Sequence, residues 1–321
     1  MNEPSKPVDC IVCGTCVADI LVRPVPLSAA LGGGRLFHVE PIDVTTGGIV
    51  CNTGIAMRRL GMKVAASSVV GSDLWGEFVR SRLAAEGIET GAIESHEKLA
   101  TSTTAVLIDP GGERTFAHHV GAPQALDVGF IRRMKPQFER SRVALVGYFG
   151  LLPALEPAMA EALGAIKASG CTVVLETGGS GGTLAELSPA LPAVDVYVPS
   201  LDEAIHQTGL QDPRGIIACY REHGAAGIVG VKLGTRGVLL SPSAGEFLEI
   251  PCVAPPGPVA DTTGAGDSFL AGLLTGMIRG LPLREAGLLG AATAACCVTG
   301  IGATAGLKSF EETRRLAGLG S

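Results

Sequence analysis

The chain has 321 residues, of which 46% are hydrophobic and 17% are charged, so it can bury the core of one large domain with a small appendage. Its net charge is −6 and it has no basic run, which argues against a nucleic-acid partner. The N-terminus up to Asp9 lacks the apolar core of a secretory signal, and the nine cysteines show no pairing scheme, so we expect a protein of the reducing cytoplasm.

The N-terminal part of the chain predicts a short buried strand at residues 10–14, followed by exposed strands. Residues 17–25 and 36–44 show the alternation of apolar and polar side chains that is typical of exposed strands, with a glycine turn at 32–34 between them. Residues 101–108 and 114–119 are predicted as two further strands, joined by a turn at 109–112. Because they interrupt a regular alternation of strands and helices, we expect them to form a small β-sheet lid, within about residues 15–46 and 101–120.

The rest of the chain alternates short apolar strands with helices. The expected main-domain strands are residues 10–14, 64–70, 143–146, 172–176, 194–198 and 228–231. The expected helices are residues 48–60, 75–86, 154–169, 202–208, 213–223, 265–279 and 284–299. This alternation predicts an α/β fold with a doubly wound, mostly parallel sheet, helices on both faces, and ligands at the carboxyl ends of the strands. We expect residues 1–321 to form a single domain of this kind together with the lid.

Residues 286–307 carry no charge over a length that could span a membrane. The segment consists mostly of glycine, alanine, threonine and cysteine, and glycines interrupt its second half. Small residues of this kind are typical of closely packed helices. We therefore expect a buried helix at residues 284–299 followed by a loop, and no membrane partner.

The most informative stretch is D-T-T-G-A-G-D-S-F, from Asp261 to Phe269, which leads into an apolar helix. Gly264 and Gly266 fall at the start of that helix, where backbone N–H groups lack helical partners and can bind an anion. Asp267 follows in the same turn. A general base beside an anion hole is the pairing that phosphoryl transfer to an alcohol needs. The alternative is that Asp267 caps the helix.

Five motifs occur in the same order as in a known family. They are G-G-I-V-C-N-T at residues 47–53, R-L-G at 59–61, G-S-D-L-W-G at 71–76, K-L-G-T-R-G at 232–237 and the stretch at 261–269. With these motifs the chain resembles the ribokinase-like, or phosphofructokinase-B, carbohydrate kinases over nearly its whole length. The resemblance implies a ribokinase-like fold and an enzyme that uses ATP and Mg²⁺ to phosphorylate a hydroxyl of a sugar or a sugar-like molecule.

The resemblance also implies roles for single residues. Asp267 resembles the catalytic base, and Gly264, Ala265 and Gly266 resemble the anion hole for the transferring phosphoryl group. The residues implied in holding the sugar are Asp19, Gly48, Asn52 and Asp267. The residues implied in the nucleotide site are Ser200, Lys232, Gly234, Thr235, Gly237 and Gly266.

Metal ions are implied at two places. The family usually carries an Asn-x-x-Glu motif that acts on Mg²⁺ through water. Here Glu203 is kept, but Ser200 stands in the Asn position, so we expect rearranged metal and phosphate contacts. Asp261, the carbonyl of Thr263 and the loop at Gly302 fall where some members bind a monovalent cation, for which K⁺ is the candidate.

The sequence leaves the acceptor open. Ribokinase has a sugar-contacting glutamate where this chain reads Gly-Tyr-Phe-Gly at residues 147–150, which argues against ribose. A nucleoside kinase of the same fold is the alternative. It would need an aromatic or apolar pocket floor, and only 4% of the residues are aromatic, which favours a sugar. His118 and His119 alternate across a strand, so at most one faces the substrate, and the simpler interpretation is a pair on the lid surface.

Two other function classes compete with a kinase. The run G-G-S-G-G around Ser180 fits the nucleophile elbow of a serine hydrolase, with Asp202 and His206 or His223 as partners. A ligand sensor without activity on a kinase scaffold would account for Ser200. The exposed edges of the lid strands predict a homodimer that shares lid sheets, with a monomer as the alternative.

Overall fold

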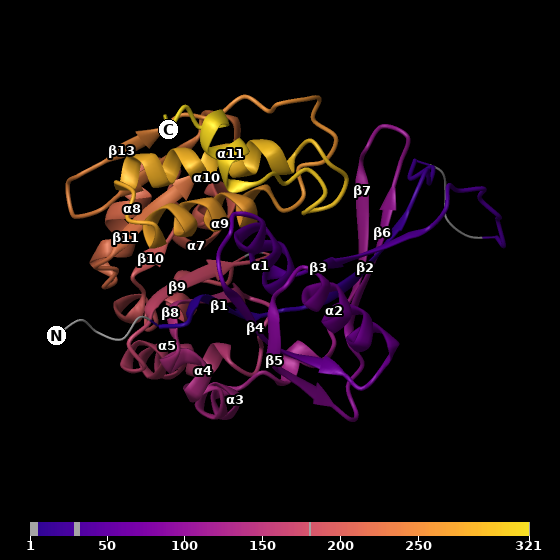
Figure 1. The fold of residues 1–321 in the computed structure, drawn as a ribbon, viewed down its shortest axis with the longest axis horizontal. Helices are drawn as coiled ribbons and strands as arrows, with labels where there is room; N and C mark the ends of the chain where they lie inside the picture. Colours follow the sequence, from indigo (N-terminus) through magenta and orange to yellow (C-terminus); the bar gives the residue numbers. More distant parts are fainter. Residues whose placement is uncertain (1–5, 29–32, 180, 321) are drawn as a thin grey trace.

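The computed structural model describes residues 6–28, 33–179 and 181–320 and contains a large and a small β-sheet (Figure 1). The large sheet has the strand order β13-β12-β11-β10-β9-β8-β1-β4-β5. Neighbours run parallel except in the pairs β11–β12 and β12–β13. The strands are β1 (Val8–Gly14), β4 (Val64–Gly71), β5 (Glu89–His96), β8 (Ser141–Phe149), β9 (Thr172–Thr177), β10 (Val196–Tyr197), β11 (Ile228–Lys232), β12 (Val238–Ser241) and β13 (Leu248–Ile250). This arrangement confirms the predicted mostly parallel sheet.

Helices cover both faces of the large sheet. They are α1 (Ile49–Arg59), α2 (Leu74–Ala85), α3 (Val128–Arg133), α4 (Lys135–Glu139), α5 (Met159–Ala168), α6 (Leu184–Leu187), α7 (Leu201–Thr208), α8 (Pro213–Glu222), α9 (Ala265–Ile278), α10 (Leu283–Cys297) and α11 (Phe310–Leu316). Along β1, Ile11 and Cys13 join the core on the side of α3, α4 and α5, whereas Cys10 and Val12 join the core on the side of α1 and α9. Such burial on both faces is typical of a central parallel strand and confirms the doubly wound layout.

The small sheet projects from the main domain (Figure 1). Its strand order is β3-β2-β6-β7. Its strands are β2 (Val17–Val22), β3 (Asp43–Gly47), β6 (Ser102–Ile108) and β7 (Arg114–His119). The strand pair β2–β6 is parallel, and the other two pairs are antiparallel. The separate lid sheet was therefore predicted correctly, and three of its four strands lie close to the predicted positions.

The strand expected at residues 36–44 was wrong in position. The structure has neither helix nor strand over residues 35–42, and the partner of β2 is β3 further along the chain. Pro41 lies inside the predicted strand and has no N–H group for a sheet, which explains the shift. The predicted glycine turn lies partly outside the described residues. Seven further elements were not predicted from the sequence: β5, β12, β13, α3, α4, α6 and α11.

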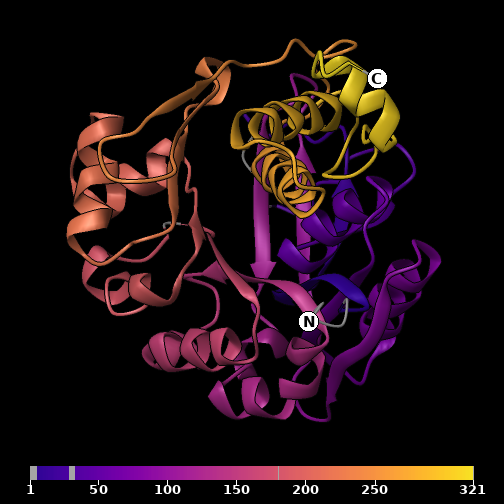
Figure 2. The same ribbon diagram turned by 60° about the vertical axis from the view of Figure 1, so that its left-hand side comes forward.

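The uncharged segment at residues 286–307 forms most of α10 and a following loop, as expected. In the described part of the chain, no helix is long and apolar enough to cross a membrane. The small residues serve the contact between α9 and α10, which lie side by side (Figure 2). A Cβ atom on Gly272 would lie 2.7 Å from the Cα of Gly290, and one on Gly276 would lie 2.6 Å from the Cα of Ala286. The two helices therefore touch backbone to backbone.

Candidate active site

A cavity of about 730 Å³ opens between the lid and the carboxyl ends of the parallel strands. Its lining includes Asp19, Thr104, Phe116 and His118 of the lid, Tyr148, Glu176 and Lys232 at strand ends, and Gly48, Asn52, Ser200, Glu203 and residues 262–267 at helix starts. A larger hollow of about 940 Å³ lies at the opposite edge of the sheet. There the cations Lys6 and Arg142 already bind backbone carbonyls and Asp9, so we place the site in the first cavity.

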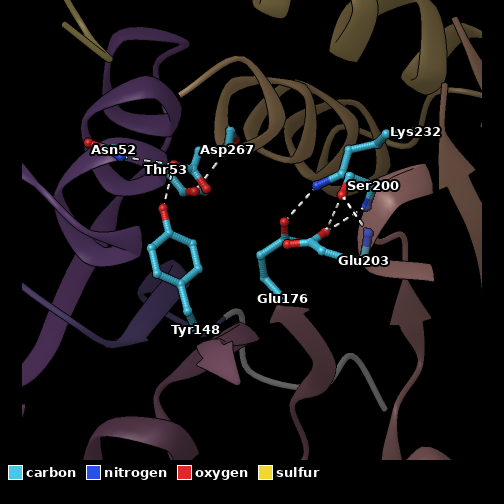
Figure 3. A network of polar contacts seen from close by, with 8 residues as sticks. All are labelled: Asn52, Thr53, Tyr148, Glu176, Ser200, Glu203, Lys232 and Asp267. Carbon is cyan, nitrogen blue, oxygen red and sulfur yellow. Dashed lines mark hydrogen bonds and ion pairs between the residues drawn. The ribbon is translucent and has the colours of Figure 1, made fainter. Parts of the chain in front are cut away.

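Asp267 lies in the first turn of α9 with 6% of its surface exposed. Its Oδ2 atom accepts hydrogen bonds from Asn52 Nδ2 at 2.8 Å and from the hydroxyl of Tyr148 at 2.7 Å (Figure 3). These partners come from α1 and from the end of β8, so the carboxylate binds other elements and not the end of its own helix. Burial raises the pKa of Asp267 above 3.8, against the opposing effect of the two hydrogen bonds. The carboxylate is thus a stronger base than an exposed one.

The start of α9 has the geometry of an anion hole. Gly264 takes a left-handed conformation with φ of 75°, and a Cβ atom there would lie 2.4 Å from the Cβ of Ala303. Gly266 and Asp267 lie in the first turn of α9, so the helix contains no carbonyl four residues earlier to accept their N–H groups. Both residues line the cavity. A Cβ atom on Gly266 would lie 3.1 Å from the Nζ of Lys232, so a side chain there would meet a cation.

A single methyl group tests this geometry. We expect Gly264→Ala to lower kcat about 100-fold, because the collision with Ala303 displaces the helix start. Gly280→Ala is the matched control, since Gly280 has φ of 78° beyond the other end of α9 and nothing within 4 Å of an added Cβ atom. Both variants carry about 1–2 kcal/mol of backbone strain. Calorimetry and an assay of ADP release separate the effects, and equal kcat values would count against the anion hole.

Lys232 and Glu176 form a buried ion pair at the ends of β11 and β9. Lys232 Nζ lies 2.6 Å from Glu176 Oε1 (Figure 3). Burial raises the pKa of Glu176 to about 8, and the positive charge of Lys232 opposes that rise. The sequence predicted Lys232 in the nucleotide site, which stays a prediction, and the structure places its Nζ next to Gly266 of the anion hole. Glu176 was missed, although a carboxylate that ends an apolar strand is a usable signal.

Ser200 and Glu203 bind each other at the start of α7. Glu203 Oε2 accepts hydrogen bonds from the N–H and the hydroxyl of Ser200, each at 2.7 Å (Figure 3). Ser200 Oγ in turn accepts from the N–H of Glu203 at 3.3 Å, which completes a capping box. Both side chains line the cavity. No group of three or more His, Cys, Asp or Glu side chains among the described residues could hold a metal ion by itself.

A row of polar side chains crosses the lid toward the cavity. Asp19, Thr104 and His118 are cross-strand neighbours on β2, β6 and β7. Thr104 Oγ1 lies 3.0 Å from His118 Nδ1. Burial raises the pKa of Asp19 to about 6, and burial lowers the pKa of His118. Both histidines are exposed on the lid, as predicted, but only His118 lines the cavity, so His118 also faces the ligand side.

Asp261 is almost fully buried and holds three hydrogen-bond donors. Its Oδ1 accepts from the N–H of Thr263 at 2.7 Å and from Arg114, and its Oδ2 accepts from the N–H of Gly302 at 2.6 Å. Burial favours the neutral acid, but these bonds, led by the one from Arg114, hold the pKa below 3.8. Asp261 is therefore an anion whose counterion is an arginine of the lid. No motif pointed to Arg114.

The other predicted residues lie as follows. Ala265 lines the cavity, although its N–H also makes a 3.3 Å turn bond to the carbonyl of Thr262. Gly48 caps α1 with φ of 81° and borders the cavity. Gly234 borders the cavity too, whereas Thr235 and Gly237 form the turn between β11 and β12 outside its lining. The part of Thr235 and Gly237 in nucleotide binding stays a prediction.

The hydrolase alternative finds little support in the fold. Ser180 lies outside the described residues. The helix that follows it, α6, has only four residues, whereas a nucleophile elbow needs a longer helix directly after the serine. His223 lies at the end of α8, where its Nδ1 is 2.8 Å from the carbonyl of Cys219.

Comparisons with known proteins identify the family and the fold. The family model described as pfkB family carbohydrate kinase matches residues 13–309. Ribokinase of Haemophilus influenzae is 29% identical over 87% of this chain and 90% of its own, and fructokinase of Klebsiella pneumoniae is 30% identical over 86% of this chain and 87% of its own. The structure of Arabidopsis thaliana ribokinase complexed with ribose and ATP superposes with a TM-score of 0.83 at 21% identity over 97% of this chain and 98% of its own.

A nucleoside kinase has the same fold. The Burkholderia thailandensis nucleoside kinase in complex with inosine gives a TM-score of 0.76 at 18% identity over 96% of each chain. At these identities the solved structures show the fold alone, and the family match carries the activity. The chain is a phosphotransferase that acts on a sugar hydroxyl, and it belongs to the pfkB family of carbohydrate kinases.

Proposed function

We propose that the cavity binds ATP and a sugar or sugar-like acceptor, and that residues 1–321 work as one kinase domain. The observation that carries this proposal is the buried carboxylate of Asp267 beside the unpaired N–H groups at the start of α9. A base and an anion hole in one helical turn are what transfer of a phosphoryl group to an alcohol requires.

In the proposed reaction, Asp267 accepts the proton of the acceptor hydroxyl. Asn52 and Tyr148 both donate to Oδ2, which fixes the carboxylate and leaves Oδ1 for the substrate. The hydroxyl oxygen forms a bond to the γ-phosphorus as the bond from that phosphorus to the β–γ bridging oxygen breaks, and ADP leaves. The N–H groups of Gly266 and Asp267, with Lys232 beside them, stabilise the charge on the transferring group.

Several buried polar atoms on residues that line the cavity have no hydrogen-bond partner in the described part of the chain. They are Asn52 Oδ1, Thr15 Oγ1, Thr177 Oγ1 and Glu176 Oε2. Unpaired buried polar atoms are costly, so a ligand rich in hydroxyl groups suits this surface. A polyhydroxylated acceptor and the ribose and phosphates of ATP are ligands of this kind.

Mg²⁺ fits this site as a companion of ATP. Glu203 and Glu176 are the carboxylates that would hold it, through water, next to the phosphates. When bound, Mg²⁺ neutralises phosphate charge. Ser200 caps α7 in place of the usual asparagine, so we infer that it acts on the phosphates only indirectly. The monovalent cation that the sequence predicted at Asp261, Thr263 and Gly302 is untested, and the guanidinium of Arg114 already pairs with Asp261 there.

Asp19 gives the acceptor site a measurable pH dependence. Because burial raises its pKa to about 6, Asp19 is charged at neutral pH and gains a proton as the pH falls through that value. A protonated Asp19 accepts fewer hydrogen bonds from acceptor hydroxyls. We therefore expect the acceptor KM to rise up to about tenfold per pH unit below pH 6. In Asp19→Asn, KM should be high and flat with pH, and the same slope in that variant would contradict the assignment. Asp109→Asn, in the turn between β6 and β7, is the control.

A nucleoside acceptor is a second candidate with structural support. The low aromatic content of the chain favours a sugar, yet the cavity has an apolar wall that contains Phe116, Val120, Pro123, Leu151 and Tyr148. Phe116 is 57% exposed, so its ring is available to a ligand. A flat base could pack on such a wall, whereas a simple sugar would leave much of it wet.

One screen separates the acceptor classes. ADP release should be measured with pentoses, hexoses, keto-deoxy acids and nucleosides, with MgATP and with the metal omitted. We expect turnover with a member of one class and none without Mg²⁺. Nucleoside turnover above that of every sugar would favour the second candidate. ATP-dependent phosphorylation of no acceptor, by a protein that binds ATP in calorimetry, would favour the sensor alternative and contradict the proposal.

The lid also supports a proposed homodimer. Ile20, Val44 and Leu107 lie on the face of the lid opposite Asp19, and all three are at least partly exposed. We infer that this face and the lid edges pair with a second copy. Sedimentation equilibrium can test this, since a monomer at micromolar concentration would contradict it.

The cysteines of the described residues are all free thiols, which supports a cytoplasmic location that cell fractionation can check.

A further inference from the structure

The loop before the anion hole carries a buried negative charge. The side chain of Asp261 is 2% exposed, and its two oxygens receive the N–H groups of Thr263 and Gly302. Thr263 directly precedes Gly264, the residue that opens the anion hole. A buried carboxylate without a cation nearby carries an uncompensated desolvation free energy, which would destabilise the loop that it organises. The position of this cation therefore matters for the phosphoryl site.

In this chain the cation belongs to the lid. Arg114 is the first residue of β7, and its guanidinium forms an ion pair with Asp261. The same Nη1 atom also donates to the hydroxyl of Thr263. Arg114 shares its face of β7 with Phe116 and His118, which line the acceptor cavity. One strand thus touches both the acceptor and the loop of the anion hole.

The guanidinium takes the place expected for a monovalent cation. Such an ion would need oxygen ligands from Asp261 and from the carbonyl of Thr263. Asp261 Oδ1 is already bound to Arg114, and the carbonyl of Thr263 accepts a hydrogen bond from the thiol of Cys297 at 3.4 Å. A second positive charge next to the guanidinium would be repelled. The contacts therefore point to a fixed cation in place of an exchangeable one.

We propose, on the basis of the kinase function above, that Arg114 is a positioning residue that replaces a monovalent cation and holds the anion hole in order when the lid is closed. Because the guanidinium of Arg114 belongs to β7, it neutralises the carboxylate of Asp261 only when the lid is closed. Turnover of the natural chain then needs no K⁺, and ATP stays protected until the acceptor has drawn the lid down.

The test compares the natural chain with Arg114→Ala, Arg114→Lys and Arg23→Ala in KCl and in tetramethylammonium chloride at equal ionic strength. Arg23 is a matched control, because it is a lid arginine whose ion pairs with Glu40 and Asp43 stay within the lid region. ADP release with the acceptor from the screen gives kcat and KM. Thermal melting of the same proteins without an acceptor gives a readout that does not depend on activity.

We expect the natural chain and Arg23→Ala to be indifferent to K⁺. Arg114→Ala should lose about 10- to 100-fold in kcat in tetramethylammonium, with little change in KM for ATP, and should regain much of it in KCl. The melting temperature of Arg114→Ala should likewise rise with K⁺. The response of Arg114→Lys to K⁺ should lie between that of the natural chain and that of Arg114→Ala. K⁺ stimulation of the natural chain would overturn the proposal. The proposal would also be overturned if neither the kcat nor the melting temperature of Arg114→Ala changed with K⁺. If no acceptor is phosphorylated the kinase proposal fails, while the melting comparison still tests Arg114.

Discussion

Asp267→Asn is expected to lower kcat by about two to four orders of magnitude, the usual contribution of a general base. The asparagine keeps an oxygen that can accept from Tyr148, but it cannot take the proton of the acceptor hydroxyl. Binding of the acceptor should change little, because the side chain keeps its size and one of its contacts. Single-turnover measurements with calorimetry of acceptor binding separate chemistry from binding.

The control for Asp267 is a carboxylate that only starts a helix. Asp212 precedes α8, is exposed, and accepts the N–H of Gly215 at 2.8 Å. Asp212→Asn should leave kcat unchanged. If Asp267→Asn turns over like Asp212→Asn, the base assignment is wrong and Asp267 has a structural role.

Lys232→Met is expected to lower kcat/KM for ATP by about 10²–10³, the usual effect of removing one donor to a developing negative charge. Lys232 Nζ is the cation next to Gly266, so it lies where the γ-phosphoryl group would be held. The variant should still fold. Without Lys232 the pKa of Glu176 rises further above 8, because burial and the negative charges of Glu203 and Asp267 then act on it unopposed, so the carboxyl stays neutral at pH 7.

Two variants bracket the lysine result. Lys167→Met removes a lysine whose Nζ is 2.8 Å from Asp195 on the surface, and it should have no effect on activity. Glu176→Gln keeps Lys232 but removes its partner, so it should affect activity less than loss of the lysine. If Lys232→Met keeps the kcat/KM of the natural chain, Lys232 is a structural flank of the nucleotide site and not a ligand of the phosphates.

The parts of the site that could be predicted from the sequence are those whose residues lie within a few positions of one another. Gly264, Gly266 and Asp267 share one helical turn, and the apolar run behind them fixes the helix, so their relation follows from local geometry. Asp19 was placed on the lid because its strand alternates. Gly48 could be placed because a glycine opens α1.

The contacts that the sequence missed join distant segments. Tyr148 is 119 residues from Asp267, and Arg114 is 147 residues from Asp261. Neither belongs to a motif, and only the folded sheets bring them to their partners. The strand expected at residues 36–44 failed for the opposite reason, because its alternation looked right while tertiary pairing selected β3 beyond Pro41. Burial in the fold, which no local pattern reports, sets the pKa values of Asp19 and Glu176.

The backbone contact between α9 and α10 leaves no space for a larger residue, so this part of the molecule tolerates substitutions less well than the lid. One added methyl at Gly272 or Gly276 would drive the helices apart and carry the base and anion hole with them. On the lid, Thr104, Phe116 and His118 line the cavity and take no part in this contact between helices, so substitutions there change the ligand surface without moving α9. A change of acceptor preference is therefore expected from substitutions on the lid, while the packed helices keep the base and the anion hole in place.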